Sequence, residues 1–175
     1  VNMAKLLTNM IAPMVINLYD AEAIVIDIRN YPNGTLWSLV EYLFPSSVHI
    51  ANFTVPDIRY PGRLYFSEEH IGSGAGSITY AGKLIILFDE RTQSQAEYTI
   101  MGLEQHPGAI KIGSTTAAAD GNVTDIALPG KIVTYASFLG VFYNDYTPTQ
   151  RVGIIPDIEA HPTIEGIRSG RDELM

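Results

Sequence analysis

The chain has 175 residues, a length typical of one domain, and we expect residues 1–175 to form a single domain. Hydrophobic residues make up 46 % and charged residues 17 %, a composition that supplies a core and excludes wholesale disorder. The net charge of −8 argues against nucleic acid as a partner, because phosphate backbones are bound by basic patches. The chain has no cysteine, which excludes disulfides, thiolate metal sites and cysteine nucleophiles.

The beginning of the chain predicts neither a membrane span nor a secretion signal. Its longest early apolar stretch, residues 10–18, is interrupted by Pro13 and Asn17 and is too short to cross a bilayer. The chain starts at Val1 and carries no charged-then-apolar signal pattern. We expect it to be the C-terminal part of a longer protein.

Apolar patterns in the first two thirds of the chain alternate between helix and strand. Helical spacing occurs over residues 3–18, where Pro13 should force a break or kink, over residues 36–44, and after Ser94. Apolar or β-branched runs predict strands at residues 23–28, 48–55, 83–88 and 109–112, with a short one at 64–66. This alternation predicts an α/β domain with a largely parallel sheet.

The last third changes to a β pattern. Residues 123–128, 131–136 and 140–143 predict successive strands, with Pro129 and Gly130 as a turn. Residues 153–158 contain Pro156 and predict an edge strand or an extended loop. We therefore expect a C-terminal β portion beside the α/β part, followed by a charged, helix-like tail.

Three loops should meet at one edge of the parallel sheet. Residues 27–34, 89–95 and 113–121 each follow a predicted buried strand. Ligands of parallel α/β sheets bind at the carboxyl ends of the strands, so these loops are candidates to form one site.

Ser94 stands where the central strand gives way to a helix, and its role has two interpretations. Residues 94–97 read S-x-x-E, the capping-box pattern that satisfies helix N–H groups without any catalysis. A serine at the N-terminus of a helix also lies beside unpaired N–H groups that can stabilise an oxyanion. Local sequence leaves both interpretations open.

Segments across the chain resemble one protein family. Residues 26–34 (IDIRNYPNG) resemble the D-x-R-x-N-x-G-G segment of the tail-specific, or C-terminal processing, serine proteases. Residues 94–97 (SQAE) are similar to the S-A-S-E nucleophile segment of that family, and residues 109–116 (AIKIGSTT) to its A-x-x-V-G-x-x-T strand and loop. Residues 152–158 (VGIIPDI) resemble its closing G-I-x-P-D-I. The resemblance covers about residues 22–160, in the same order.

The resemblance implies a crotonase/ClpP-like superhelical core and a serine endopeptidase that acts on peptide or protein substrates. Ser94 would be the nucleophile, and the backbone N–H groups of Gly34 and Gln95 would form the oxyanion hole. Bacterial members of the family are commonly exported, which implies a periplasmic or secreted location. The resemblance implies no cofactor.

The proton acceptor departs from the pattern of the family. Bacterial members use a lysine at the position that here falls on Ala119 or Asp120, so a lysine dyad is excluded. The tricorn-like branch uses a histidine from an N-terminal segment, with a glutamate at the position of Gln150 here. We therefore expect the base to be a histidine outside this chain, with Glu97, Asp120 and Gln150 as possible supporting residues.

A second function class stays open. The interphotoreceptor retinoid-binding proteins share the fold of the family without proteolysis, so the chain could be a binding module for a peptide or an apolar ligand. No clustered His, Asp or Glu spacing predicts a metal site. The sequence gives no indication of the oligomeric state.

Overall fold

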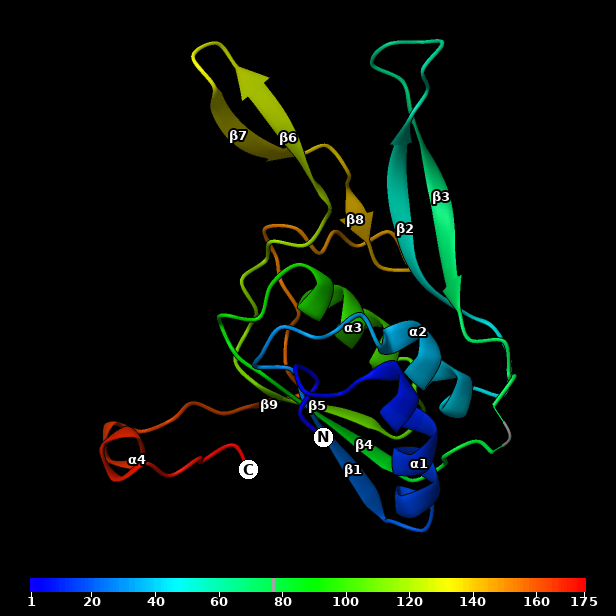
Figure 1. Ribbon diagram of the computed structural model, residues 1–175, viewed down its shortest axis with the longest axis vertical. Coiled ribbons are helices and arrows are strands. Elements are labelled where there is room, and N and C mark those ends of the chain that lie inside the picture. Colours follow the sequence, from blue (N-terminus) through cyan, green and yellow to red (C-terminus); the bar gives the residue numbers. More distant parts are fainter. Residues whose placement is uncertain (77) are drawn as a thin grey trace.

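The apolar runs after residues 22, 82 and 108 fold into a parallel sheet, as predicted. The computed structural model describes residues 1–76 and 78–175, and Figure 1 shows this sheet beneath helices α2 and α3, with α1 beside it. The strand order of this sheet is β1-β4-β5-β9. Its strands are β1 (Ala23–Asp27), β4 (Lys83–Phe88), β5 (Ala109–Gly113) and β9 (Ile158–Glu159).

Buried aliphatic side chains hold β1 and β4 together in a parallel register. Ile24 pairs with Leu84 and Ile26 with Ile86, and each of these side chains is at most 4 % exposed. Burying one such side chain stabilises the fold by about 1.5–3 kcal/mol. The packed strands therefore hold in place the loops that follow their carboxyl ends.

The helices differ from their predicted bounds at several ends. They are α1 (Thr8–Leu18), α2 (Leu36–Leu39), the 3-10 helix η1 (Val40–Tyr42), α3 (Gln95–Leu103) and α4 (Ile164–Ser169). Residues before Thr8 are not helical, because the Met3 N–H donates to the Asp27 carbonyl and Asn2 forms a bridge with β1. Pro13 was expected to break or kink this helix; it lies inside α1, so it does not break it.

The remaining strands form antiparallel sheets that stand away from the parallel one (Figure 1). One sheet has the order β3-β2-β8, and the other is the hairpin β6-β7. These strands are β2 (Val48–Pro56), β3 (Leu64–Ile71), β6 (Val123–Leu128), β7 (Ile132–Ser137) and β8 (Val141–Phe142). Strand β3 is longer than the predicted residues 64–66, because it pairs with β2 along its whole length.

The structure confirms the α/β class, the mostly parallel core sheet and the C-terminal β portion. Residues 153–157 form a loop, and only the short strand β9 continues the segment that was predicted to be an edge strand or loop. The superhelical assignment and the single domain stay predictions. No helix in the described part of the chain has both the length and the apolar character to cross a membrane.

Candidate active site

Ser94 occupies a strained turn between β4 and α3. Its backbone angles are φ 55° and ψ −127°, a conformation that residues other than glycine rarely adopt. Such strain persists only where the surroundings enforce it, and the sharp strand-to-helix turn is how hydrolases expose a nucleophilic serine. Ser94 is half-buried and lines a cleft.

Glu97 is the group that holds this turn in place. One of its carboxylate oxygens accepts from the N–H groups of Ser94 and Ala119, both at 3.0 Å. The other oxygen accepts from the Ala118 N–H at 3.0 Å and from the Thr116 hydroxyl. Glu97 is fully buried, so its carboxylate ties residues 116–119 to the start of α3 from inside the protein and does not face the cleft.

Gly34 and Gln95 present backbone N–H groups that no other group uses. Across residues 1–76 and 78–175, neither N–H has a hydrogen-bond partner. Gly34 has φ +68°, and a Cβ atom there would come 3.3 Å from the Gln95 side-chain nitrogen. The absence of a side chain at Gly34 therefore lets the loop after β1 approach the start of α3 closely.

Hydrogen bonds join the three loops at the carboxyl edge of the sheet. The Thr92 carbonyl accepts from the Ala117 N–H at 2.9 Å, and the Thr92 hydroxyl donates to the Ile28 carbonyl at 3.4 Å. Each loop also contributes to the cleft: Tyr31 from the first, Ser94 from the second and Asp120 from the third. The predicted convergence of the three loops is confirmed.

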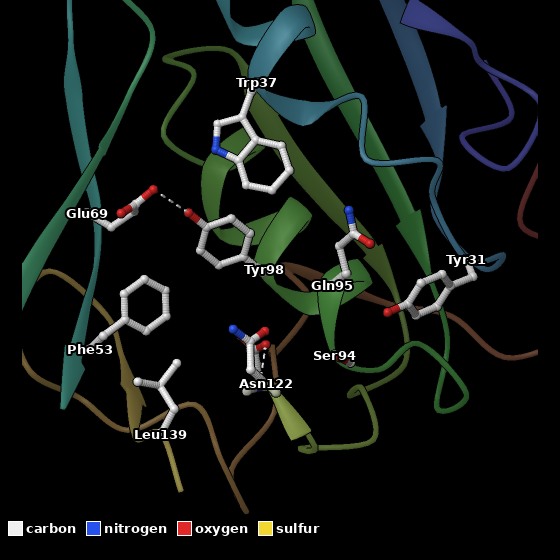
Figure 2. Close-up of a pocket in the computed structure, with 11 residues that line it drawn as sticks. Tyr31, Trp37, Phe53, Glu69, Ser94, Gln95, Tyr98, Asn122 and Leu139 are labelled. Carbon is white, nitrogen blue, oxygen red and sulfur yellow. Dashed lines mark hydrogen bonds between the residues drawn. The ribbon is translucent and has the colours of Figure 1, made fainter. Parts of the chain in front are cut away.

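The cleft has a volume of about 450 Å³ and an aromatic wall. The Tyr98 ring lies between Trp37 and Phe53, with ring centroids 5.9 Å from it on each side. The Tyr98 hydroxyl donates to Glu69 at 3.2 Å (Figure 2). The lining residues are Tyr31, Trp37, Phe53, Glu69, Ser94, Gln95, Tyr98, Asp120, Gly121, Asn122 and Leu139.

Asp120 is a buried carboxyl group with an unused oxygen. Its Oδ1 accepts from the Gly121 N–H at 2.7 Å, whereas no described group binds its Oδ2. The pKa of Asp120 is raised to about 7, chiefly because the carboxyl group is buried; the Gly121 hydrogen bond opposes this rise and the negative charge of Glu97 adds to it. Asp120 therefore can exchange a proton near neutral pH.

Gln150 lies behind Asp120, outside the cleft lining. Its side-chain nitrogen donates to the carbonyls of Asp120 and Leu139, both at 2.8 Å. Its side-chain oxygen accepts from the Val141 N–H at 3.4 Å. Gln150 thus ties the third loop to the strand β8, which fixes where Asp120 lies.

The described residues that line the cleft include no lysine and no histidine. Lys111 places its ammonium 2.7 Å from Glu104, and both groups are mostly buried. His106 is buried and contacts the Tyr80 carbonyl at 3.1 Å. The described cleft residues therefore include Ser94 and the carboxyl groups of Glu69 and Asp120, without either of the usual basic side chains.

A match to a protein-family model shows the family of this chain. The model of peptidase family S41 matches residues 2–160. The chain belongs to peptidase family S41. This confirms the family predicted from residues 26–34, 94–97, 109–116 and 152–158. No curated protein matches the chain.

Several solved structures share the fold of this chain. A protein described as a peptidase from Parabacteroides merdae is 14 % identical, covers 99 % of this chain and 56 % of its own, and has a TM-score of 0.83. Mature CPAF in complex with lactacystin is 14 % identical, with coverages of 93 % and 44 % and a TM-score of 0.78. The photosystem II D1 C-terminal processing protease is 17 % identical, with coverages of 90 % and 39 % and a TM-score of 0.61. The chain thus spans about half the length of these structures, or less.

The S41 resemblance could find Ser94 and its neighbours, but it missed the aromatic wall. Trp37 comes from α2, Tyr98 from α3, and Phe53 and Glu69 from the paired strands β2 and β3. Phe53 and Glu69 carry no motif in the sequence. They reach the cleft that Ser94 lines only because β2 pairs with β3.

Proposed function

We propose that this chain is the core of a serine endopeptidase that hydrolyses peptide bonds through Ser94. The observation that carries the proposal is the position of Ser94 on a strained turn, in a cleft, next to the free N–H groups of Gly34 and Gln95. Membership of the S41 family supports the same reaction class.

The reaction would proceed by acyl transfer. The Ser94 oxygen bonds to the substrate carbonyl carbon and loses its proton to a base, while the carbonyl oxygen gains negative charge. The Gly34 and Gln95 N–H groups and the N-terminus of α3 stabilise that charge. The C–N bond then breaks as the amine takes the proton, and water releases the acyl group from Ser94.

The proposed base is a histidine from outside these 175 residues, oriented by Asp120. An imidazole N–H would satisfy the Oδ2 atom of Asp120, which is buried and has no partner among the described residues. The resulting carboxylate–imidazole pair would stabilise the imidazolium that forms as Ser94 loses its proton. Glu97 and Gln150 support the site by holding the loop that carries Asp120.

The cleft wall suggests which substrates fit. Trp37, Phe53 and Tyr98 offer a flat aromatic surface beside Ser94 (Figure 2). Aromatic faces stabilise bulky apolar side chains by burying large areas. We therefore propose peptide or protein substrates with a large apolar residue near the cleaved bond.

The test is a fluorophosphonate probe applied to the natural full-length protein, together with a peptide-hydrolysis assay. The Ser94→Ala variant should lose the label and at least about 10³-fold of kcat/KM. Ser67→Ala, an exposed serine on β3, serves as the matched control and should keep both. Hydrolysis that persists in Ser94→Ala would show the assignment to be wrong.

One observation favours a second function, a binding module for a peptide or an apolar ligand. The described cleft residues supply neither a lysine nor a histidine that could activate Ser94. Under this alternative the full-length protein takes no label and hydrolyses no peptide. A hydrophobic ligand would then quench the fluorescence of Trp37, which lines the cleft.

The proposed periplasmic or secreted location is tested separately, by fractionating the cells that produce the protein.

A further inference from the structure

Two strands outside the catalytic loops bring metal-binding side chains together. His49 on β2 lies directly opposite His70 on β3, and the two rings stack with centroids 4.8 Å apart. Glu68 lies two residues before His70, so both side chains project from the same face of β3. One ligand atom from each of the three side chains lies within 4.8 Å of the other two.

The hydrogen bonds of His49 prepare one of its nitrogens for a metal. Its Nε2 lies 3.1 Å from the Ala51 carbonyl and 3.1 Å from the Asn52 side-chain oxygen. The Asn52 amide nitrogen donates to the Tyr143 carbonyl at 2.8 Å, so the Asn52 oxygen faces His49. Both neighbours of Nε2 are acceptors; Nε2 therefore carries the proton, and Nδ1 keeps its lone pair. Metal-binding histidines are typically held in this way by a carbonyl on the second nitrogen.

The donor set indicates the class of cation. Two imidazoles and one carboxylate suit zinc and similar first-row divalent ions, whereas Mg²⁺ and Ca²⁺ prefer oxygen ligands only. Ligand atoms on one tetrahedral zinc lie about 3.3 Å apart, given Zn–N and Zn–O distances of about 2.0–2.2 Å. Glu68 and His70 are exposed, so rotation of their side chains suffices to reach that spacing. The spacing of residues in the sequence did not predict this site, since residues 49 and 68–70 meet only through the pairing of β2 with β3.

The same strand segments carry the aromatic wall of the cleft on their other side. Glu69, between Glu68 and His70, points to the cleft and accepts from the Tyr98 hydroxyl. Asn52, which orients His49, is followed by Phe53, another cleft residue. A cation bound on the face that carries His49, Glu68 and His70 would therefore hold together the two strands that present Phe53 and Glu69 to the cleft on the opposite face.

We propose that His49, Glu68 and His70 form a binding site for a zinc-type divalent cation, which braces the cleft wall made by Phe53 and Glu69. The fourth coordination position is left to water, as in zinc sites with three protein ligands. The site requires no activity of Ser94, so it stands or falls independently of the proposed peptidase.

The binding test is calorimetric titration of the chelator-treated 175-residue chain with Zn²⁺ alone. We expect one Zn²⁺ per chain, and we expect His70→Asn to weaken binding at least about 10-fold. His161→Asn is the matched control, because His161 is exposed and contacts a single carboxylate, Glu159, at 3.0 Å. Circular dichroism confirms that each variant is folded. Absence of binding, or equal affinity in His70→Asn and the unchanged chain, would overturn the site.

The bracing effect has its own measurement. Trp37 is the single tryptophan of the chain and lies in the cleft against Tyr98, so its fluorescence reports the state of the wall. Saturating Zn²⁺ should shift or quench this fluorescence in the unchanged chain and in Ser94→Ala, but not in His70→Asn. If Zn²⁺ binds and Trp37 does not respond in the unchanged chain, the bracing role is wrong.

Discussion

The parallel sheet and the antiparallel strands contribute to the cleft in opposite ways. In β4, Leu84 and the run from Ile86 to Phe88 are buried, and the loop that follows carries Ser94. In β3, six of eight residues are exposed, and Glu69 from this strand lines the cleft. The parallel sheet therefore holds the reactive groups by burial, whereas the antiparallel strands present side chains to whatever enters the cleft. Substitutions in the parallel sheet and its loops should therefore alter the stability and geometry of the site around Ser94. Substitutions in the antiparallel strands should instead alter the binding of a molecule in the cleft.

The largest effect should come from the buried carboxylate that fixes the Ser94 turn. Glu97→Ala removes the acceptor of four hydrogen bonds, from Ser94, Thr116, Ala118 and Ala119. Buried donors left without partners should lower the free energy of unfolding by about 3 kcal/mol or more. Urea unfolding of the purified variant measures this loss.

The matched control for that variant is an exposed carboxylate in the same region. Glu90 accepts from the Ser114 hydroxyl at 2.8 Å but remains exposed. Glu90→Ala should therefore change the free energy of unfolding by no more than about 0.5 kcal/mol. Similar losses in the two variants would contradict the role assigned to Glu97.

The next effect concerns the proposed oxyanion donors. Gly34→Ala places a side chain at φ +68°, 3.3 Å from the Gln95 side chain, and should displace the loop that carries the Gly34 N–H. We expect kcat/KM for peptide hydrolysis to fall about 10²-fold, the scale measured when one oxyanion donor is removed. The strain itself should lower the free energy of unfolding by about 1 kcal/mol.

A second glycine separates strain from catalysis. Gly130, in the turn between β6 and β7, has φ +85° and open space around its Cβ position. Gly130→Ala should lower the free energy of unfolding by a similar amount, about 1 kcal/mol, and leave kcat/KM unchanged. An equal loss of activity in both variants would mean that Gly34 acts only through stability.

The contrast between the two regions also explains what the sequence could predict. Residues 84–88 are continuously apolar because both faces of β4 are covered, and such runs predict buried parallel strands directly. The position of Ser94 between a strand and the start of a helix could be predicted, because both elements follow from local sequence. The loops then converge by a general property of parallel sheets.

The cleft wall could not be predicted, because it depends on pairing between distant strands. Phe53 and Glu69 are sixteen residues apart in the sequence and reach the same cleft only through the register of β2 with β3. That register includes an irregularity between His49 and Ala51, which no composition rule locates. The same pairing hides the cluster of His49, Glu68 and His70.

An effect that depends on pH should follow from Asp120. Its pKa is about 7 in the folded protein and 3.8 as an ordinary carboxyl, so the folded state binds more protons between these values. Stability should therefore fall as the pH rises from about 4 to about 7, and level off above that. Asp120→Asn should remove this slope from urea unfolding measured across the range.

The matched control for Asp120 is a carboxylate whose pKa is lowered rather than raised. Asp145 is exposed, and its hydrogen bonds from Thr147 lower its pKa. Asp145→Asn should leave the slope between pH 4 and pH 7 as it is in the unchanged protein. If Asp120→Asn keeps the slope too, the buried carboxyl is not its source.

The smallest changes in the free energy of unfolding should come from removing one tyrosine hydroxyl in each of the two regions. Tyr80 is 1 % exposed, and its hydroxyl lies 2.9 Å from the Ala21 carbonyl and 3.2 Å from the Lys83 carbonyl, beside the parallel sheet. Tyr80→Phe should lower the free energy of unfolding by about 1 kcal/mol, because the carbonyls of Ala21 and Lys83 lose a donor. Tyr135 on β7 is 64 % exposed, so Tyr135→Phe should change it by less than about 0.3 kcal/mol. Equal changes in urea unfolding would mean that the hairpin β6-β7 is as firmly packed as the core, and that the division between the two regions is wrong.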